Sequence, residues 1–287
     1  MRVASATECQ VWVPKCNLCG SGIQHDYLHG MHGERLVQCG DCGFVFLNPR
    51  IREIDQADHE VEPIWIREEK WRRIDDRRRL AEIRATHPAG SLLDVGCYCG
   101  FFLAEASQAG YHTTGVEIAP AAAAYARETL GLNVHNGTVE SMLTATQRFN
   151  VITMFHVLEH VASPMAVLDA LAKAQDKGDL LVVEVPRLDS LVFNTLRQRH
   201  RHVSIEHSSY FTRKTLTAAL AKSGYTVTIT KNVGRTMSVP WIAWRLSHSV
   251  PRFGSLATRV ARLSDNNWGR IHLNLGDIIR VHAVRGD

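Results

Sequence analysis

Four cysteines near the start of the chain are arranged as two matched pairs. Cys16 and Cys19 stand in KCNLCGS, and Cys39 and Cys42 stand in QCGDCGF, with nineteen residues between the pairs. A C-x2-C turn, with a glycine directly after each pair, points two thiolates at one ion, and two such turns complete a tetrahedral shell. Because four thiolates leave no open coordination position, the spacing predicts a structural zinc site.

Two other interpretations of these cysteines remain, namely four unrelated buried thiols or a redox pair. Matched pairs rarely arise by chance, and two copies in a small glycine-rich segment favour a metal over redox chemistry. A segment of this size cannot bury enough apolar surface alone, so the ion would supply much of its folding energy. We therefore place a small zinc-binding module at residues 1–50.

The stretch LLDVGCYCGFF, residues 92–102, has the form of a strand that ends in a glycine turn before a helix. Asp94, Gly96 and Gly100 lie where an open α/β sheet binds a nucleotide, and the two glycines would let the backbone approach it. Glu117 ends the next expected strand, 23 residues after Asp94. A carboxylate there can accept hydrogen bonds from both hydroxyls of a ribose. Spacing alone does not separate NAD from S-adenosylmethionine.

Short β-like runs alternate with helical stretches from residue 91 onward, which predicts a doubly wound parallel sheet with helical crossovers. This domain would span residues 91–287. The charge-rich segment 64–86 predicts a connecting helix within residues 51–90. The expected strands cover residues 92–96, 112–117, 132–135, 149–154, 179–185, 225–231 and 277–284.

Five motifs in this domain occur in a recognisable order: LLDVGCYCGFF, GVEIAP, NGTVESM, FNVITMFHVLEHVASPMAVL and GDLLVVEVP. From about residue 64 to the C-terminus they resemble the motifs of class I S-adenosylmethionine-dependent methyltransferases. The resemblance implies S-adenosylmethionine as the cofactor and a seven-stranded Rossmann-like sheet whose last strand, GDIIRVHAV, is inserted antiparallel beside the fifth. The cysteine module and the NPR after it are similar to the subgroup that includes sugar-nucleotide C-methyltransferases. A sugar nucleotide or related glycan precursor is therefore the implied acceptor.

The resemblance also implies which residues surround the cofactor. They are Asp94, Gly96 and Gly100 at the methionine part, Glu117 at the ribose, Thr138, Val139 and Glu140 at the adenine, and Phe155 and His156 beside the sulfonium.

Several residues near these motifs need their own interpretation. Tyr98 stands where the family usually has glycine, and we expect its side chain at the mouth of the cofactor site, covering the methionine end or contacting the acceptor. Cys97 and Cys99 are interpreted as small turn residues. Glu159 and His160, in FHVLEHV, are interpreted as architectural and cofactor-side groups.

The segment SIEHSSYFTRKTL follows the fifth expected strand and resembles the EH-x-x-YF stretch of the subgroup, in which a histidine is proposed as the base. Methyl transfer mainly requires an aligned acceptor that loses its proton. His207 is thus the candidate base, with Glu206 orienting it and Tyr210 hydrogen-bonding the acceptor. The alternative is that Glu206 and His207 cap a helix whose N-cap is Thr212.

Arginines gather in two other places. Arg197, Arg199 and Arg201 in RQRHRHV could grip an anionic acceptor, or they could belong to a solvated loop. The basic run 77–79 is interpreted as a solvated helical face rather than a nucleic-acid patch. The insert 235–275 could form a substrate lid, a dimer contact, an interfacial helix or a helix packed on its own domain.

Composition sets the broad class of the protein. The 287 residues are 45% hydrophobic and 22% charged, with a net charge of +4. This suits one domain plus a small module, and the few basic residues near the cysteines disfavour a nucleic-acid partner. With no apolar run of about 20 residues and no signal-peptide core, we expect a cytoplasmic protein.

From the motifs taken together, we expect a methyltransferase acting on a small molecule. The rivals are a nucleic-acid methyltransferase or binding module and a nicotinamide-dependent oxidoreductase. The methylated atom and the oligomeric state stay open.

Overall fold

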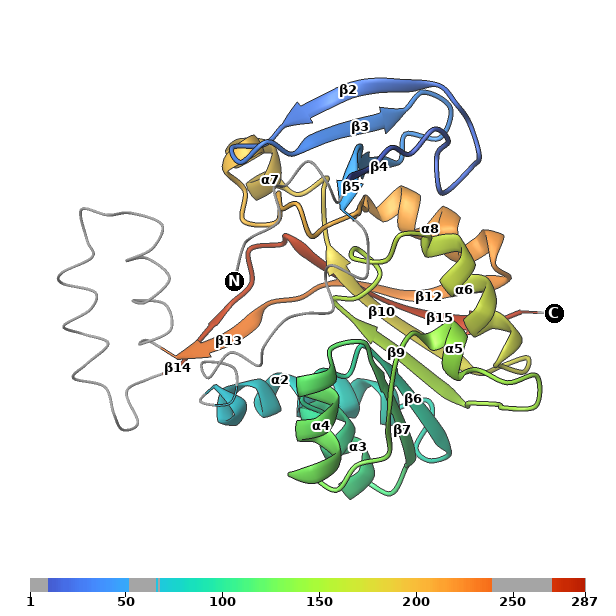
Figure 1. The fold of residues 1–287 in the computed structure, drawn as a ribbon. Helices are drawn as coiled ribbons and strands as arrows, with labels where there is room; N and C mark the ends of the chain where they lie inside the picture. The colour runs from blue at the N-terminus through green and yellow to red at the C-terminus, as the bar shows by residue number, and fades with distance from the viewer. Residues whose placement is uncertain (1–9, 52–65, 67, 239–269, 287) are drawn as a thin grey trace.

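The computed structural model describes residues 10–51, 66, 68–238 and 270–286. Its largest unit is a seven-stranded sheet in the order β12-β15-β10-β9-β6-β7-β8, which confirms the predicted fold class (Figure 1). Each strand lies within two residues of its expected bounds. The strands are β6 (Ser91–Val95), β7 (His112–Glu117), β8 (Val134–Asn136), β9 (Val151–Phe155), β10 (Leu180–Pro186), β12 (Tyr225–Asn232) and β15 (Ile278–Arg285).

The last strand is inserted between two others, as the sequence predicts. β15 pairs antiparallel with both β10 and β12, whereas β9 pairs in parallel with β10 and with β6. From β6 the chain moves outward through β7 to β8 and then returns to β9 on the other side of β6. Because strand order reverses between β6 and β9, the carboxyl ends of these strands border the crevice where such sheets bind ligands.

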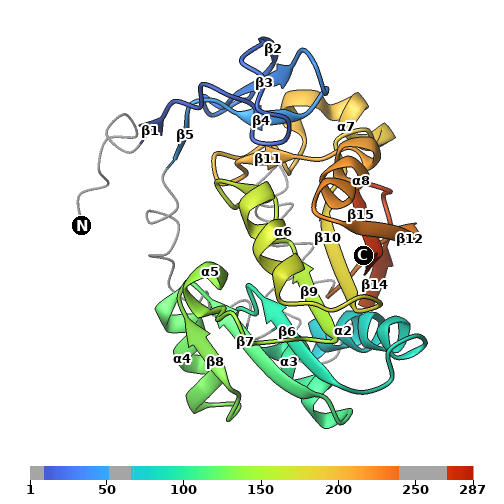
Figure 2. The same ribbon diagram turned by 90° about the vertical axis from the view of Figure 1, so that its right-hand side faces the viewer.

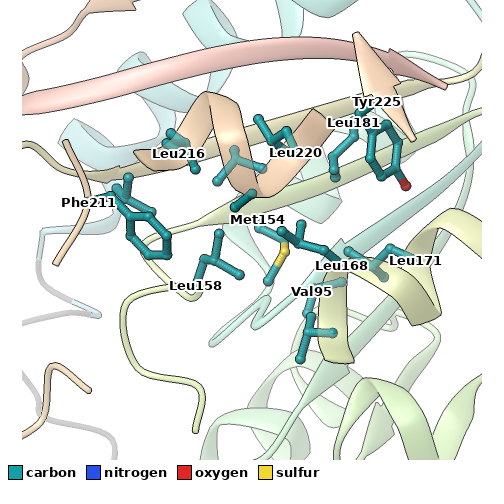
Figure 3. Close-up of a cluster of buried hydrophobic side chains, with 14 of the residues drawn as sticks. Val95, Met154, Leu158, Leu168, Leu171, Leu181, Phe211, Leu216, Leu220 and Tyr225 are labelled. Carbon is teal, nitrogen blue, oxygen red and sulfur yellow. The ribbon is translucent and has the colours of Figure 1, made fainter. Parts of the chain in front are cut away.

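Helices cover both faces of the sheet and bury its apolar residues. On one face lie α2 (Glu69–Arg84), α3 (Phe101–Gln108) and α4 (Pro120–Glu128). On the other lie α5 (Val139–Met142), α6 (Pro164–Lys173) and α8 (Arg213–Lys222), as Figure 2 shows for α6 and α8. Figure 3 shows Met154 of β9 beside Leu168 of α6 and Leu216 of α8. The expected connecting helix is α2 in its described part.

Local sequence explains where several helices begin. Pro120 and Pro164 occupy the first turns of α4 and α6, where a proline loses no helical hydrogen bond. Thr212 is the N-cap of α8, as predicted, and forms a capping box with Thr215. Ser190 caps α7 (Leu191–Leu196), which is followed by the short 3-10 helix η2 (Arg197–Arg199).

The cysteine-bearing segment forms a second sheet above the first, seen in blue in Figure 1. Its order is β11-β4-β3-β2, built from β2 (Gln24–His29), β3 (Arg35–Cys39), β4 (Val45–Leu47) and β11 (Ser209–Tyr210). The strand β11 comes from the segment after β10, far from the other three in sequence. Phe44 and Phe46 lie in the same buried cluster as residues of the seven-stranded sheet. The two sheets therefore share a core. The strand β11 belongs to the cysteine-bearing sheet, although it follows β10 of the seven-stranded sheet in the chain. Two short strands, β1 (Gln10–Val11) and β5 (Arg50–Ile51), pair beside this sheet.

Two strands frame the insert that the sequence singles out. β13 (Arg235–Ser238) pairs antiparallel with β14 (Arg270–Leu273). β13 is fixed to α2 because the amide of Thr236 donates to Asp75 and the hydroxyl of Ser238 donates to Glu68. Residues 239–269, the middle of the proposed lid, lie outside the described residues. Among the helices that are described, none has the length and apolar character needed to cross a membrane.

Candidate active site

A cavity of about 130 Å³ opens at the carboxyl ends of β6, β7 and β8. It lies beside the strand-order reversal, where the sequence places the cofactor. Half of the ten predicted cofactor residues line it, and most of its other walls are valines and an isoleucine. The lining residues are Val95, Gly96, Val116, Glu117, Ile118, Gly137, Thr138, Val139, Glu140, Val157, His160, Val161 and Val167.

The two predicted glycines serve different contacts. Gly96 has φ 68°, and a Cβ there would collide with the side chain of Val157. Gly96 also lines the cavity, so the turn needs glycine where the backbone borders the ligand space. Gly100 has φ 80°, and a Cβ there would lie 2.6 Å from Leu132 and 3.1 Å from Ala126. Gly100 therefore permits α3 and α4 to pack closely and does not line the cavity.

Tyr98 adopts a left-handed backbone, with φ 48°, in a turn position that favours glycine. Its backbone amide donates to Glu117 Oε2 at 2.8 Å. Its ring packs against a buried cluster that includes Phe101 and Ala119, on the side of α3 and α4. The side chain expected at the mouth of the site thus lies outside the lining of the cavity, because apolar packing against these helices fixes its direction.

Two buried carboxyl groups define the electrostatics of the turn. Glu117 accepts amide hydrogen bonds from Tyr98 and Ala119, but its burial still raises its pKa above the ordinary value. Asp94 lies beneath the turn, where Thr153 donates a 2.7 Å hydrogen bond to it, and burial raises the pKa of Asp94 to about 7. Glu117 borders the ligand space directly, whereas Asp94 supports the turn from below.

The end of β9 carries the predicted residues Phe155 and His156. Phe155 packs edge-on against Phe102, with ring centres 4.9 Å apart. His156 has φ 60° and bridges two acids, with Nε2 3.0 Å from Glu184 and Nδ1 3.2 Å from Glu159. Neither residue lines the cavity; they lie just behind its β9 edge.

Sequence reasoning missed the ion pairs behind this edge. Arg79 of α2 contacts Glu184 at 2.5 Å, and Arg280 of β15 contacts it at 2.8 Å. Burial opposes ionisation of Glu184, but Arg79, His156 and Arg280 outweigh it and hold its pKa well below the ordinary value. Of the run read as a solvated face, Arg77 and Arg78 are exposed but Arg79 is not, because α2 turns it toward the sheet. In the sequence, only the helical periodicity of α2 indicates that the side chain of Arg79 faces the sheet.

On the other side of the cavity, His160 and His207 come together with Glu159. Their ligand-capable atoms all lie within 4.8 Å of one another, and the two histidine rings meet edge to face at 4.7 Å. Burial, together with the nearby His160, lowers the pKa of His207 to about 4, although Glu159 opposes the shift. The acid beside His207 is therefore Glu159. The predicted partner Glu206 has an exposed side chain, because the chain turns between residues 206 and 207.

Tyr210, which is predicted to hydrogen-bond the acceptor, lies in β11. Its hydroxyl donates to the carbonyl of Ser204 and accepts from the amide of Ser204. Only 4% of Tyr210 is exposed, and its ring packs in a cluster beneath the cysteine-bearing sheet. The hydroxyl of Tyr210 is thus bonded within the local loop, and contact of Tyr210 with an acceptor stays a prediction.

The three arginines interpreted as either a grip on an anionic acceptor or a solvated loop do not converge in the structure. Arg197 lies over the ring of Tyr27, 5.4 Å from the ring centre, and Arg201 pairs with Asp277 at 3.0 Å. Arg199 is exposed in η2. Arg197 and Arg201 contact different residues and Arg199 is exposed, so the three side chains form no shared anion grip in this conformation.

The four predicted cysteines gather in the second sheet. The sulfurs of Cys16 and Cys42 lie 3.6 Å apart, and those of Cys19 and Cys39 lie 3.5 Å apart. A tetrahedral zinc site with bonds of about 2.3 Å requires sulfurs about 3.8 Å apart, so the donor set fits the ion. The amide of Leu18 also donates to the sulfur of Cys16.

Ionisation of the cysteines differs from one to the next. Burial raises the pKa of Cys16 to about 11. For Cys39, burial is outweighed by hydrogen bonds from the backbone of Cys42 and Asp41, and the pKa falls to about 7. Four crowded thiols therefore do not all ionise unaided, which is the condition that a bound cation would change.

Residues 66–229 match the family model described as a methyltransferase domain. The match covers more than half of the chain. The chain belongs to the methyltransferase domain family. This agrees with the motif order and with the topology of the seven-stranded sheet.

Curated relatives resemble parts of this methyltransferase domain. A ubiquinone biosynthesis O-methyltransferase of Cereibacter sphaeroides (strain ATCC 17025) is 35% identical over 96 residues, which are 32% of this chain and 39% of the relative. The corresponding protein of Hahella chejuensis is 28% identical over 126 residues, 42% of this chain and 48% of the relative. The chain thus spans less than half the length of these relatives.

Solved structures show the same fold at low identity. A SAM-dependent methyltransferase from Archaeoglobus fulgidus superposes with a TM-score of 0.53 at 17% identity, covering 78% of this chain and 100% of the other. Magnesium protoporphyrin IX methyltransferase from Synechocystis PCC 6803, solved with bound SAH, gives 0.50 at 15% identity, covering 80% and 90%. At these identities the likeness concerns the fold alone.

Proposed function

We propose that the chain transfers a methyl group from S-adenosylmethionine to a small-molecule acceptor. The observation that carries this proposal is the cavity at the ends of β6, β7 and β8, with Glu117 in its wall. Family membership favours this cofactor over a nicotinamide, because the matching family is one of methyltransferase domains. When bound, S-adenosylmethionine supplies a methyl group already activated by a sulfonium.

The residues of the cavity fit such a cofactor. The amides of Tyr98 and Ala119 donate to different oxygens of Glu117, and the carboxylate borders the cavity, where it can also accept from a ribose diol. Val139 offers an apolar wall and Thr138 and Glu140 flank it, as suits the flat face of an adenine. Gly96 brings the backbone to the edge of the cavity. We assign Asp94 and His156 to the support of this frame.

The acceptor side of the proposed reaction is the cluster of Glu159, His160 and His207. His160 lines the cavity, and His207 packs against it. Proton removal from the acceptor is assigned to this cluster, in which the sequence predicts His207 as the base. The motif resemblance supports a sugar nucleotide or glycan precursor as the acceptor. The names of the curated relatives support a hydroxyl as the alternative methylated group.

The four-cysteine cluster is proposed to hold a structural zinc ion. Cys16, Cys19, Cys39 and Cys42 would be its ligands and would complete its coordination, so the ion would serve folding and leave no open position for an acceptor. We propose a zinc module at residues 1–50, a connecting segment at 51–90 and a cofactor domain at 91–287. The zinc module would also position β11, because β11 pairs with β4.

Calorimetric melting with S-adenosylhomocysteine and with NAD tests the cofactor. A ligand at about 100 times its dissociation constant stabilises the native state by about 2.7 kcal/mol, so S-adenosylhomocysteine should raise the melting temperature and NAD should not. Glu117→Ala removes hydrogen bonds to a charged group, each contributing about 1.5–3 kcal/mol, and should weaken binding by about 10-fold or more.

The matched control for Glu117→Ala is Glu128→Ala, which changes an exposed acid at the end of α4. This variant should bind S-adenosylhomocysteine as the unmodified protein does. Stabilisation by NAD alone, or equal affinity in both variants, would contradict the proposed cofactor site.

A further inference from the structure

Glu159, His160 and His207 form a compact set of metal-ligand types at the edge of the cofactor cavity. Glu159 is 2% exposed and His207 is 9% exposed, whereas His160 borders the cavity itself. One nitrogen or oxygen from each lies within 4.8 Å of the others. The three come from two distant segments, since Glu159 and His160 follow β9 and His207 precedes β11.

One polar side-chain atom of each of these residues has no hydrogen-bond partner among the described residues. His160 Nδ1 lies 3.0 Å from the carbonyl oxygen of Glu206, and a carbonyl can only accept, so Nδ1 carries the proton. The other ring nitrogen, Nε2, is then a bare acceptor. For Nε2 the part of the chain that the structure describes supplies no hydrogen-bond partner.

His207 and Glu159 show the same feature deeper in the protein. The buried Nδ1 of His207 has no hydrogen-bond partner among the described residues. Glu159 Oε1 contacts His156, but the buried Oε2 also has no partner there. A buried polar atom without a hydrogen-bond partner lowers the stability of the folded protein, and more so when the group is charged. A cation bound by one ligand atom from each of the three side chains, whose ligand atoms lie within 4.8 Å of one another, would satisfy these side chains together.

Neighbouring residues hydrogen-bond these side chains in the way that metal ligands are usually oriented in proteins. Histidines that bind metals almost always donate their other N–H to a carbonyl or a carboxylate, as His160 does to Glu206. His156 fixes the second oxygen of Glu159 at 3.2 Å. The amide of Ser209 donates to the carbonyl of Glu159, which ties the His207 segment to the β9 segment.

We propose that Glu159, His160 and His207 bind a divalent transition-metal ion, with Zn²⁺ as the ion to test. Two imidazoles and one carboxylate are a ligand set of open sites, which keep a position for a further oxygen ligand. Tetrahedral donors at about 2.1 Å from the ion lie about 3.4 Å apart. Because the ligand atoms of the three side chains lie within 4.8 Å of one another, binding would shorten these distances by about 1.4 Å at most.

The open position would face the acceptor, because His160 lines the cavity. There the ion would polarise an acceptor oxygen and ease loss of its proton to solvent. His207 would then act as a ligand and not take up the proton itself. The site stands on its own geometry, and only this role for the ion rests on the proposed function.

Metal content of the full-length protein tests the site directly. After dialysis against excess ZnCl₂ and removal of loose metal, elemental analysis should give two zinc ions per chain, one in each predicted site. His160→Ala, His207→Ala and Glu159→Gln should each retain one. In calorimetric titrations with ZnCl₂, these variants should bind the second ion at least about 100-fold more weakly, since even losing a group behind a ligand costs 10–100-fold.

His112→Ala is the matched control, because His112 is exposed at the first position of β7, at the opposite end of the strand from Glu117. This variant should hold two ions with unchanged affinity. Melting curves and S-adenosylhomocysteine binding, measured on the same samples, separate a folding defect from loss of a ligand.

One zinc ion per chain in the unmodified protein, lost on Cys39→Ser, would overturn the proposal. His207 would then remain the candidate for direct proton removal. Binding of S-adenosylhomocysteine without a second zinc ion would overturn the metal site alone. A second zinc ion in a protein that does not bind S-adenosylhomocysteine would overturn the proposed function and leave the metal site intact.

Discussion

In the four-cysteine cluster the polar atoms face one another, whereas in the cofactor cavity the acidic groups are held by the surrounding protein. The cysteine sulfurs lie 3.5 and 3.6 Å apart in pairs, with no other group between them. At the cavity, backbone amides hold Glu117 and the Thr153 hydroxyl holds Asp94. In the first arrangement the proposed ion would hold the four sulfurs together, while the second is complete as folded and keeps its buried acids at an energetic cost.

This difference indicates that the four-cysteine cluster would depend on its bound ion for folding, whereas the cofactor cavity would not depend on its cofactor. Structural zinc in isolated fingers binds with an apparent free energy of about 10 kcal/mol or more, which is folding energy for the small sheet around it. The cavity rests on the seven-stranded sheet, whose core includes fully buried residues such as Leu93, Ile152 and Met154. We therefore expect loss of a sulfur ligand to disturb the fold more than any change at the cavity.

The largest expected effect comes from Cys39→Ser. Loss of one thiolate should release the zinc and lower the free energy of unfolding by several kcal/mol, because the sheet β11-β4-β3-β2 loses its ion. His207, two residues before β11, should lose its fixed position as well. Zinc analysis and thermal unfolding measure both effects.

The control for this change is Cys99→Ala, which removes a buried thiol in the cofactor turn. It should keep the zinc and show a much smaller loss of stability. If Cys39→Ser melts at the same temperature as the unmodified protein, the small sheet is stabilised by its shared apolar core around Phe44 and Phe46, and the contrast between the two regions fails.

A smaller, pH-dependent effect is expected from Asp94→Asn. Burial raises the pKa of Asp94 to about 7, against about 3.9 in the unfolded chain. Because the folded state holds this proton more tightly, stability falls as the pH rises from about 4 to about 7 and is then constant. Asparagine can still accept from Thr153 but cannot ionise. The variant should gain up to about 4 kcal/mol over the unmodified protein at pH 8 and about nothing at pH 4.

Urea unfolding at several pH values measures this difference, with Glu128→Gln on the surface of α4 as the control. Only the difference between the curves reports on Asp94, because acids with lowered pKa, such as Glu184, contribute in the opposite direction. A constant gap between the variant and the unmodified protein from pH 4 to 8 would show that the cavity carries no such cost.

The smallest effect is expected from Tyr98→Gly. Glycine relieves a left-handed backbone that costs other residues roughly 1–2 kcal/mol, but the variant loses the ring packed beside Phe101. These terms should nearly cancel, leaving stability within about 1 kcal/mol. Affinity for S-adenosylhomocysteine should not change, because the Tyr98 amide that holds Glu117 remains. A tenfold or greater loss of affinity would instead place the ring at the cofactor, as the sequence predicts.

Local signals were enough to predict most of the fold. The alternation of β-like and helical runs gave the seven strands to within two residues, and Thr212 was identified as an N-cap from its type and place. These features depend on short stretches of chain. The surroundings of Tyr98, Tyr210 and Arg79 differ from those expected, because they depend on what lies across from each side chain, and no local pattern contains that information.

The sequence by itself determined the cysteine set, the glycine turn and Glu117, because their spacing reflects covalent geometry within one turn or one βαβ unit. Only the tertiary structure decided that β11 completes the cysteine-bearing sheet and that Glu159 and His160 meet His207. Those contacts join residues far apart in the sequence, since Ser209 and Phe46 are 163 residues apart and His160 and Glu206 are 46 residues apart. Packing of two sheets on a shared core brings them together, and that packing is a property of the whole chain.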